Sequence, residues 1–289
     1  MPQEQTDGAD PAETHPPAGR PAVAVRRADR VATVMIDRED KRNALSIEVI
    51  AGLRAAVAGV KADPQVRVMV LRGAGDRAFC AGGDLAEMRA TTDPLAAHHG
   101  RGELANLFTD LWSLGKPTIA RVAGHAVAGG LGLALACDFV LASDTASFCA
   151  PEVDAGLWGF MITVPMLRSM PPKLALDMLL TGRRFTAEQA QQAGFVRSVS
   201  PLAQLDDEVA ALAATLAAKP PDAVRLGRDA FYKVVDLAAA DALATLHPLL
   251  TVLLAGEEAA EGLAAFAQRR SPRWAARTST IAPQPTKEE

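Results

Sequence analysis

The distribution of hydrophobic residues predicts an alternating region followed by a helical one. Between residues 31 and 142, short apolar runs of strand length alternate with longer segments of helical periodicity. The predicted strands cover residues 31–37, 66–71, 118–122 and 139–142; the predicted helices cover 46–62, 97–114 and 131–137, and another begins near Asp84. Such alternation favours parallel strands joined by crossover helices, and therefore an α/β fold.

After about residue 169 the pattern becomes helical. Thr186 and Gln189 have the spacing of a capping box, and Gly194 is placed to end that helix. Helices rich in Ala and Leu are then predicted over 205–219, 222–235 and 238–268. They are amphipathic but carry few polar residues. We therefore expect them to need a partner surface, within the chain or in another subunit.

The two ends of the chain lack this patterning. Residues 1–20, rich in Pro, Ala, Glu and Gly, and residues 278–289 are predicted to be disordered tails. The rest is predicted to divide into a core at 21–200, which would hold the functional site, and a helical region at 201–277.

Composition narrows the functional classes. The net charge of −4 argues against a nucleic-acid partner, although a local cluster of arginines could still serve an anionic ligand. The three cysteines and five histidines show no metal-ligand spacing, so no metal is expected. Because neither a secretory signal nor a membrane-spanning segment is evident, we expect a soluble cytoplasmic protein without a membrane partner.

Two glycine-rich segments carry the candidate chemistry. Phe79-Cys-Ala-Gly-Gly-Asp84 and Gly124-His-Ala-Val-Ala-Gly-Gly130 each follow a predicted strand and lead into a helix. Glycines allow a ligand to approach the backbone closely, and two convergent N–H donors form an oxyanion hole. Two structural turns remain the alternative interpretation. The looser dinucleotide pattern at Gly73-Ala-Gly75 lacks a helix that begins there.

With these two segments the sequence resembles the enoyl-CoA hydratase/isomerase (crotonase) superfamily. The resemblance covers about residues 22–274 and its motifs occur in family order. The further matches are Asp40-Lys-Arg-Asn-Ala-Leu45, Phe148-Cys-Ala-Pro-Glu-Val153, Leu180-Thr-Gly182, Ala190-Gln-Gln-Ala-Gly194 and Glu261-Gly-Leu-Ala-Ala-Phe266.

The resemblance implies a fold, an assembly and a substrate. The implied fold is a spiral of ββα units with a C-terminal helical trimerisation region, in a homotrimer or homohexamer. The implied substrate is an acyl-CoA thioester, so that coenzyme A is part of the substrate and no separate cofactor is expected.

The resemblance also implies site residues. It implies that Ala81 and Gly129 supply the two oxyanion N–H groups and that Glu152 is the catalytic acid/base. The implied substrate-binding residues are Gly82, Gly83 and Asp84 of the first loop, Arg42 and Ala44 along the coenzyme A moiety, and Phe266 and Arg269 near its nucleotide, in many members from a neighbouring subunit.

The acid–base positions depart from the family hydratases, which hold a water molecule between two glutamates. Glu152 matches one of them, whereas Gly132 stands in place of the other, and Phe160 stands where dienoyl isomerases have an aspartate. One glutamate suits proton transfer between two carbons, as in an enoyl-CoA isomerase, while hydration would need another group to hold the water. A catalytically silent acyl-CoA-binding protein is the remaining alternative.

Several neighbouring residues have structural interpretations. We expect Cys80 to pack, Asp138 to make a structural hydrogen bond, and His125 to take no part in catalysis. Trp158 and Phe160 are expected, with Met161, to line the acyl pocket.

Overall fold

The larger of two sheets contains most of the predicted strands. The computed structural model describes residues 21–90 and 93–274, so the predicted tails at 1–20 and 278–289 lie outside the described residues. This sheet has the order β1-β2-β3-β5-β7-β10, in which β1 pairs antiparallel with β2 and every other pair is parallel. Its strands are β1 (Val23–Ala28), β2 (Val31–Ile36), β3 (Val68–Gly73), β5 (Thr118–Val122), β7 (Phe139–Ser143) and β10 (Ser198–Ser200).

A smaller sheet occupies segments that the sequence predicts as loops. Its strands are β4 (Ala78–Cys80), β6 (His125–Val127), β8 (Ser147–Cys149) and β9 (Phe185–Thr186). The second glycine-rich segment, at 124–130, therefore contains the strand β6, which the sequence does not predict. The strand β1 also escapes prediction, because its outer half is exposed; a tight turn with positive φ at Asp29 and Arg30 adds it to β2.

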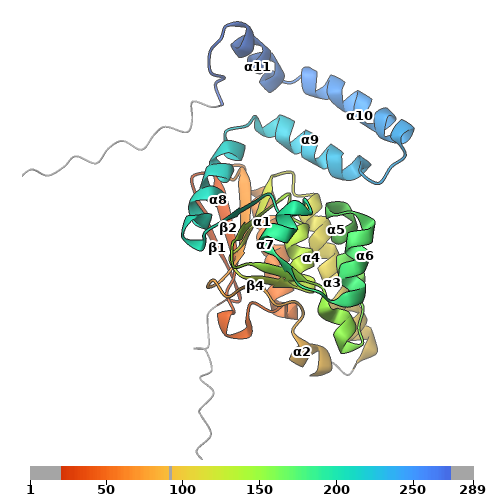
Figure 1. Cartoon of the computed structure of the whole chain (residues 1–289). Helices are drawn as coiled ribbons and strands as arrows, with labels where there is room; N and C mark the ends of the chain where they lie inside the picture. The colour runs from red at the N-terminus through yellow and green to blue at the C-terminus, as the bar shows by residue number, and fades with distance from the viewer. Residues whose placement is uncertain (1–20, 91–92, 275–289) are drawn as a thin grey trace, which may run out of the picture.

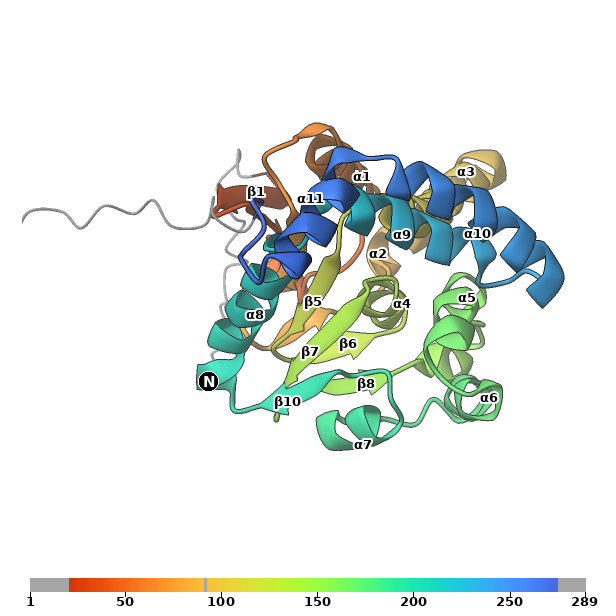
Figure 2. The same cartoon turned by 90° about the horizontal axis from the view of Figure 1, so that it is seen from above.

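The two sheets alternate along the chain. The strands β3, β5 and β7 of the larger sheet are followed by β4, β6 and β8 of the smaller one, and then by helices. In Figure 2, β5 and β7 lie beside β6 and β8, and the chain continues from β6 into α4 and from β8 toward α5. The predicted spiral of ββα units is thereby confirmed. The helices of this part are α1 (Ile47–Ala62), α2 (Leu85–Ala90), α3 (Pro94–Trp112), α4 (Gly129–Leu135), α5 (Phe160–Ser169), α6 (Pro172–Thr181) and α7 (Ala187–Gln192).

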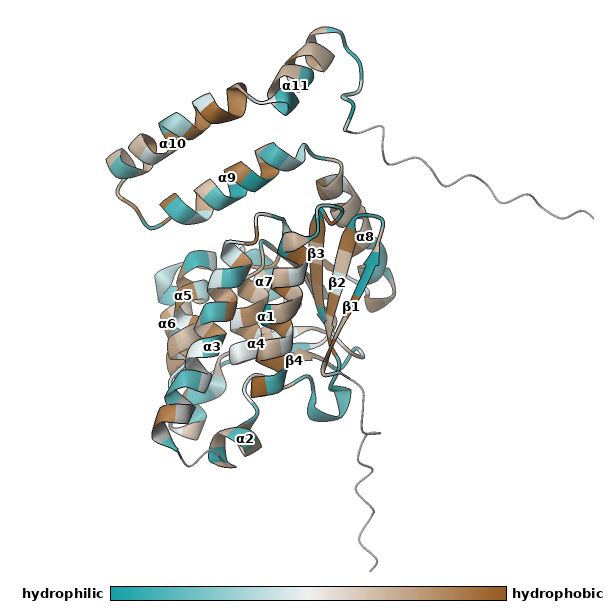
Figure 3. Cartoon of the chain, turned by 180° about the vertical axis from the view of Figure 1, so that it is seen from behind, coloured by the Kyte–Doolittle hydropathy of each residue, from teal (hydrophilic) through white to brown (hydrophobic). Residues whose placement is uncertain are grey.

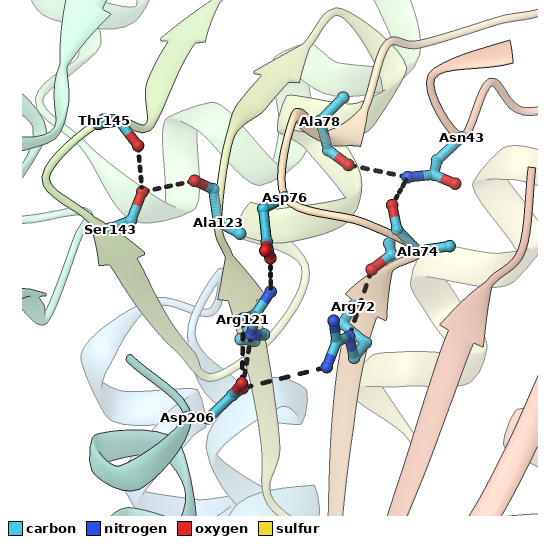
Figure 4. A network of polar contacts seen from close by, with 11 residues as sticks. Asn43, Arg72, Ala74, Asp76, Ala78, Arg121, Ala123, Ser143, Thr145 and Asp206 are labelled. Atoms are coloured by element: carbon cyan, nitrogen blue, oxygen red, sulfur yellow. Dashed lines mark hydrogen bonds and ion pairs between the residues drawn. The ribbon is translucent and has the colours of Figure 1, made fainter. Parts of the chain in front are cut away.

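The helix α8 (Leu202–Ala217) covers one face of the larger sheet. Leu205 and Val209 are buried with Val68 and Ile119 in a second apolar cluster. A buried guanidinium reinforces this contact, since Arg121 on β5 donates to both carboxylate oxygens of Asp206, at 2.7 and 3.2 Å, and to Asp76 at 3.0 Å (Figure 4). The boundary predicted at 200/201 therefore assigns α8 to the C-terminal region, although this helix packs against the core.

The C-terminal helices project from the core. They are α9 (Pro221–Val234), α10 (Ala239–Leu254) and α11 (Glu257–Ala267), and they lie at one end of the molecule (Figure 1). The helix predicted over 238–268 is in fact two helices, because Gly256 takes an extended conformation and caps α11. The apolar helix α10 has no buried residue (Figure 3).

In the described ranges no single helix is long and apolar enough to cross a membrane. Together α10 and α11 are long and apolar enough to do so, but the two helices meet at a bend of 71°.

One polar cluster attaches α9 to the core. Asp138 accepts hydrogen bonds from the backbone N–H and the hydroxyl of Thr118, from Arg228 at 2.8 Å and from Tyr232 at 2.6 Å. Arg228 also donates to the carbonyl groups of Leu111 and Trp112 and so caps the end of α3. The structural hydrogen bond predicted for Asp138 is confirmed.

Removing this carboxylate should destabilise the protein strongly. The side chains of Arg228 and Asp138 are 8% and 15% exposed, so Asp138→Ala leaves a buried guanidinium without its counter-ion. We expect the free energy of unfolding to fall by about 3–5 kcal/mol in urea denaturation. The exposed pair Arg225–Asp222 is the control, since Arg225→Ala should change it by about 0.5 kcal/mol or less. Equal effects would contradict the assigned role of Asp138.

Candidate active site

A cavity of about 830 Å³ lies between the glycine-rich segments and four helices. Its wall includes Gly83, Ala128, Gly129 and Glu152. The rest of the wall comes from α1, α2, α3 and the start of α5. These residues are Leu45, Ile47, Ile50, Leu85, Glu87, Met88, Gly100, Leu104, Gly156, Leu157, Trp158, Gly159, Phe160, Met161 and Ile162. The predicted lining by Trp158, Phe160 and Met161 is confirmed.

A buried asparagine holds the loop that precedes α1. Asn43 is fully buried with φ 57°, a left-handed conformation that asparagine tolerates. Its amide donates to the carbonyl groups of Ala74 and Ala78 (Figure 4). Its Oδ1 accepts from the backbone N–H of Arg38. The loop at 38–45 is thereby attached to the segment that leads into β4.

The side chain of Arg38 joins the same two segments. It donates to the carbonyl of Ala44 at 3.1 Å and to the carboxylate of Asp84 at 3.1 Å. Burial alone would raise the pKa of Asp84, but hydrogen bonds from the Glu87 backbone and from Arg38 lower it. Through its hydrogen bond with Arg38, Asp84 therefore fixes the position of the first glycine-rich loop, in which it lies. The sequence offers no signal for this role of Arg38.

The two glycine-rich segments are in direct backbone contact. A Cβ on Gly82, whose φ is +92°, would lie 2.8 Å from the Ala128 Cβ and 3.3 Å from the Gly129 nitrogen. A Cβ on Gly130 would lie 2.2 Å from the carbonyl oxygen of Cys80. Only residues without a side chain permit this approach. The segments predicted to act together are therefore brought together.

The hydrogen bonds of the first segment identify which N–H group is free. The N–H of Ala81 donates to the Arg42 carbonyl at 3.1 Å, which contradicts the prediction that Ala81 supplies an oxyanion donor. The N–H of Gly82 faces the Cys80 sulfur, and that of Asp84 donates to Leu45. Among the described residues, the N–H of Gly83 has no acceptor.

The second segment is bent so that Gly129 borders the cavity. Ala128 has φ 52° and ψ −124°, a strained combination for a residue with a side chain, and its N–H donates to the carbonyl of Cys149. Gly129 is the first residue of α4, where an N–H has no acceptor within the helix. Gly83 and Gly129 both line the cavity, whereas Ala81 does not.

Glu152 lies on the cavity wall in the 3-10 turn Pro151–Ala155. Its Oε2 is buried and has no hydrogen-bond partner in the described part of the chain. Burial raises the pKa of this carboxyl above the usual 4.5, against a smaller opposing effect of its own backbone N–H. A carboxyl in this state suits both acceptance and return of a proton.

The position of the missing second glutamate is filled by packing. A Cβ on Gly132 would lie 2.5 Å from the Ile162 Cγ2 and 3.1 Å from the Phe108 ring. No larger side chain fits there unless α5 moves. Glu87 is another carboxylate on the cavity wall, but its Oε2 accepts the backbone N–H of Ile47 at 2.9 Å.

Other predicted binding residues lie outside the cavity lining. Arg42 is exposed beside the cavity loops, and Ala44 is buried behind them. Phe266 and Arg269 lie at the end of α11; the Phe266 side chain is 87% exposed. The structure does not bring these two residues to the cavity of their own chain.

The two alternative nucleophile or base residues are engaged elsewhere. Burial raises the pKa of the Cys80 thiol to about 12, consistent with the predicted packing role. His125 Nδ1 contacts the Ser147 hydroxyl at 2.8 Å and does not line the cavity. Burial, followed by the charges of Arg184 and Arg42, lowers the pKa of this histidine.

A carboxyl with a raised pKa and two backbone N–H groups that have no acceptor among the described residues border one apolar cavity. Such an arrangement is suited to enzymes that stabilise a negative charge on a carbonyl oxygen, including those that form an enolate. The enoyl-CoA hydratase/isomerase family model matches residues 26–277. The chain therefore belongs to the enoyl-CoA hydratase/isomerase family, whose members act on coenzyme A thioesters.

Individual relatives agree with this assignment. The chain is 36% identical over 252 residues to the (E)-benzylidenesuccinyl-CoA hydratase of Thauera aromatica, covering 86% of this chain and 97% of that protein. It is 34% identical over 254 residues to the carnitinyl-CoA dehydratase of Proteus mirabilis, covering 86% and 95%. The crystal structure of an enoyl-CoA hydratase from Mycobacterium smegmatis superposes with a TM-score of 0.85 at 32% identity, covering 88% of this chain and 99% of that one.

The contact at Gly82 should be essential to the site. Gly82→Ala should both destabilise the fold and separate the two segments, because the new Cβ meets Ala128 and the carbonyl of Val127. We expect at least a tenfold weaker affinity for an acyl-CoA in calorimetry. Gly194→Ala is the control, since φ there is +89° but nothing lies within 4 Å of the new Cβ. It should cost about 1–2 kcal/mol of stability and leave binding intact. Intact binding by Gly82→Ala would contradict this account of the site.

Proposed function

We propose that the protein moves a proton between two carbons of an enoyl-CoA while Gly83 and Gly129 hold its thioester oxygen. The observation that supports this is the meeting of both backbone N–H groups and Glu152 on one cavity wall. Hydrogen bonds from two N–H groups stabilise the negative charge that develops on the oxygen, and removal of one such donor typically costs about 3–4 kcal/mol of barrier.

The proposed reaction needs no group beyond these. The Glu152 carboxylate takes a proton from C2 of a 3-enoyl-CoA, and the electron pair of that C–H bond is delocalised into a dienolate. The neutral carboxyl then returns the proton to C4, which leaves a 2-enoyl-CoA and restores the carboxylate. Burial helps the first step, because it raises the pKa of Glu152 and so makes the carboxylate a stronger base.

Hydration is the second candidate, and the hydratase and dehydratase relatives favour it. In hydration a water molecule must be held for attack at C3. The contact between Gly132 and Ile162 leaves no room for a second carboxylate there, and Glu87 is bonded to Ile47. These contacts support isomerisation over hydration.

We propose further that the protein assembles as a homotrimer or a dimer of trimers through α9–α11. The apolar helix α10 buries none of its residues within its own chain, and Leu243 and Val252 are among its exposed side chains. In such an assembly, Phe266 and Arg269 would be available to the coenzyme A nucleotide bound by a neighbouring subunit.

Neutralising the carboxylate tests the catalytic role. Glu152→Gln should lower kcat for 3-enoyl-CoA isomerisation at least about 100-fold, the usual contribution of a general base. It should bind a saturated acyl-CoA within a few-fold of the original protein. Asp154→Asn is the control, because this exposed carboxylate lies on the same turn. It should retain activity.

The assay also distinguishes the candidates. Conversion of 3-enoyl-CoA without water addition supports isomerisation, and faster water addition to 2-enoyl-CoA supports hydration. Binding without turnover of either substrate would identify a catalytically silent acyl-CoA-binding protein. Full activity of Glu152→Gln would remove Glu152 from the mechanism.

The raised pKa of Glu152 predicts a pH dependence. Activity requires the carboxylate, so kcat/KM should rise with pH along a limb that lies above pH 4.5. Stability should follow the opposite trend, because folding favours the neutral form. The contribution of neutral Glu152 to the free energy of unfolding is present below the unfolded-state pKa of this carboxyl. It is lost as the pH rises through the folded-state pKa. Glu152→Gln should therefore melt higher than the original protein at neutral pH, with the difference vanishing near pH 4. A constant difference in Tm across this range would contradict the burial of the charge.

A further inference from the structure

The acyl side of the cavity is wide, apolar and open to solvent. Phe160, Leu85 and Leu157 on its wall are 70%, 61% and 48% exposed. Large apolar side chains that surround a cavity and remain exposed in one chain indicate a surface that a hydrophobic ligand covers. The volume of about 830 Å³ lies toward the upper end of the roughly 300–1,000 Å³ found for ligand pockets.

The charges on the wall limit what this ligand carries. Glu87 and Glu152 are the charged side chains of the described residues that line the cavity, and both are acidic. No cationic side chain among those residues is available to pair with a carboxylate on the acyl group. An anionic substituent would therefore be desolvated without a partner, at a substantial cost in free energy.

The direction of the acyl chain follows from α3. A Cβ on Gly129 would lie 3.7 Å from the Leu104 Cδ2, so Leu104 is beside the proposed thioester position. Gly100 precedes Leu104 by four residues on the same face of α3, about 6 Å farther along the helix axis. An acyl chain that passes Leu104 along the helix thus reaches Gly100.

Gly100 leaves this part of the cavity open. A Cβ at this position would lie 3.8 Å from the Ile47 Cδ1, which is ordinary contact, so a larger residue could be accommodated by the helix but would project into the cavity. A glycine inside a helix costs about 1 kcal/mol relative to alanine. On the cavity wall, this glycine leaves space for the ligand that a larger side chain would occupy.

We infer that the protein selects acyl-CoA thioesters with a medium or long uncharged hydrocarbon acyl group, and that Gly100 is the residue that admits the distal part of this group. This inference rests on the proposed function, since it places the thioester at Gly83 and Gly129. The length of the acyl group is inferred from the open space between Leu104 and Gly100. Its lack of charge is inferred from the acidic and apolar cavity wall.

The test compares two substitutions on one helix. Gly100→Leu fills the channel, whereas Gly102→Leu is a matched control, because nothing lies within 4 Å of a Cβ at Gly102 and that residue does not line the cavity. Both replace a glycine of α3 by the same residue, so their effects on helix stability are comparable. The probes are S-butyl-, S-octyl- and S-dodecyl-CoA, measured by titration calorimetry.

For the original protein we expect the affinity to rise up to about fourfold per added methylene, the factor for complete burial of each group. Gly100→Leu should bind S-butyl-CoA within about twofold of the original protein but S-dodecyl-CoA at least about tenfold more weakly. Gly102→Leu should retain the full series. An S-alkyl-CoA of dodecyl length with a terminal carboxylate should bind at least about tenfold more weakly than S-dodecyl-CoA.

Each other outcome overturns a defined part. Equal affinity for all chain lengths, or equal losses in Gly100→Leu and Gly102→Leu, overturns the inference and leaves the proposed function standing. Equal binding of the carboxylate-bearing probe overturns the assignment of an uncharged group. Failure of every probe to bind the original protein overturns the proposed function together with this inference.

Discussion

The close backbone contact between the segments at 80–83 and 128–130 is the constraint on which the site depends. The strands β4 and β6 are neighbours in the small sheet, so the segments that follow them leave the sheet side by side. Gly82 and Gly130 then allow an approach that any Cβ would prevent. This contact places Gly83 and Gly129 on the wall of one cavity, and Asn43 and Arg38 hold the neighbouring loop against it. The small sheet therefore has a functional role that its few hydrogen bonds would not suggest.

The same region combines stability and strain. The core beneath the cavity is tightly packed, and Ile162 and Phe108 occupy the space beside Gly132. Above it, Glu152 has a buried oxygen without a hydrogen-bond partner among the described residues, and Ala128 has a strained backbone. A charged or unpaired group that is buried reduces stability, and such groups are retained where they serve chemistry. The packing at Gly132 and the burial of Glu152 together favour a single mobile proton over a held water molecule.

The sequence predicts β2, β3, β5 and β7 of the larger sheet and most helices, because their apolar runs are long enough to show a period. It does not predict the small sheet, whose strands of two or three residues resemble turns. The glycine-rich segments could be identified from residue types and order, and Glu152 from the resemblance to the family. The choice between Ala81 and Gly83 could not, because it depends on a hydrogen bond from Ala81 to Arg42 that forms only in the folded chain. Likewise, Gly132 reveals a missing carboxylate, but only the fold shows that Ile162 fills its place.

In the proposed reaction Gly83 and Gly129, and not Ala81, donate to the thioester oxygen. The most direct measurement is the amide proton chemical shift of these three residues by nuclear magnetic resonance, before and after saturation with an unreactive saturated acyl-CoA. The amide protons of Gly83 and Gly129 should move downfield on formation of new hydrogen bonds, while that of Ala81, already hydrogen-bonded to the carbonyl of Arg42, should change little. A downfield shift of Ala81 with both glycines unchanged would contradict this assignment of the donors.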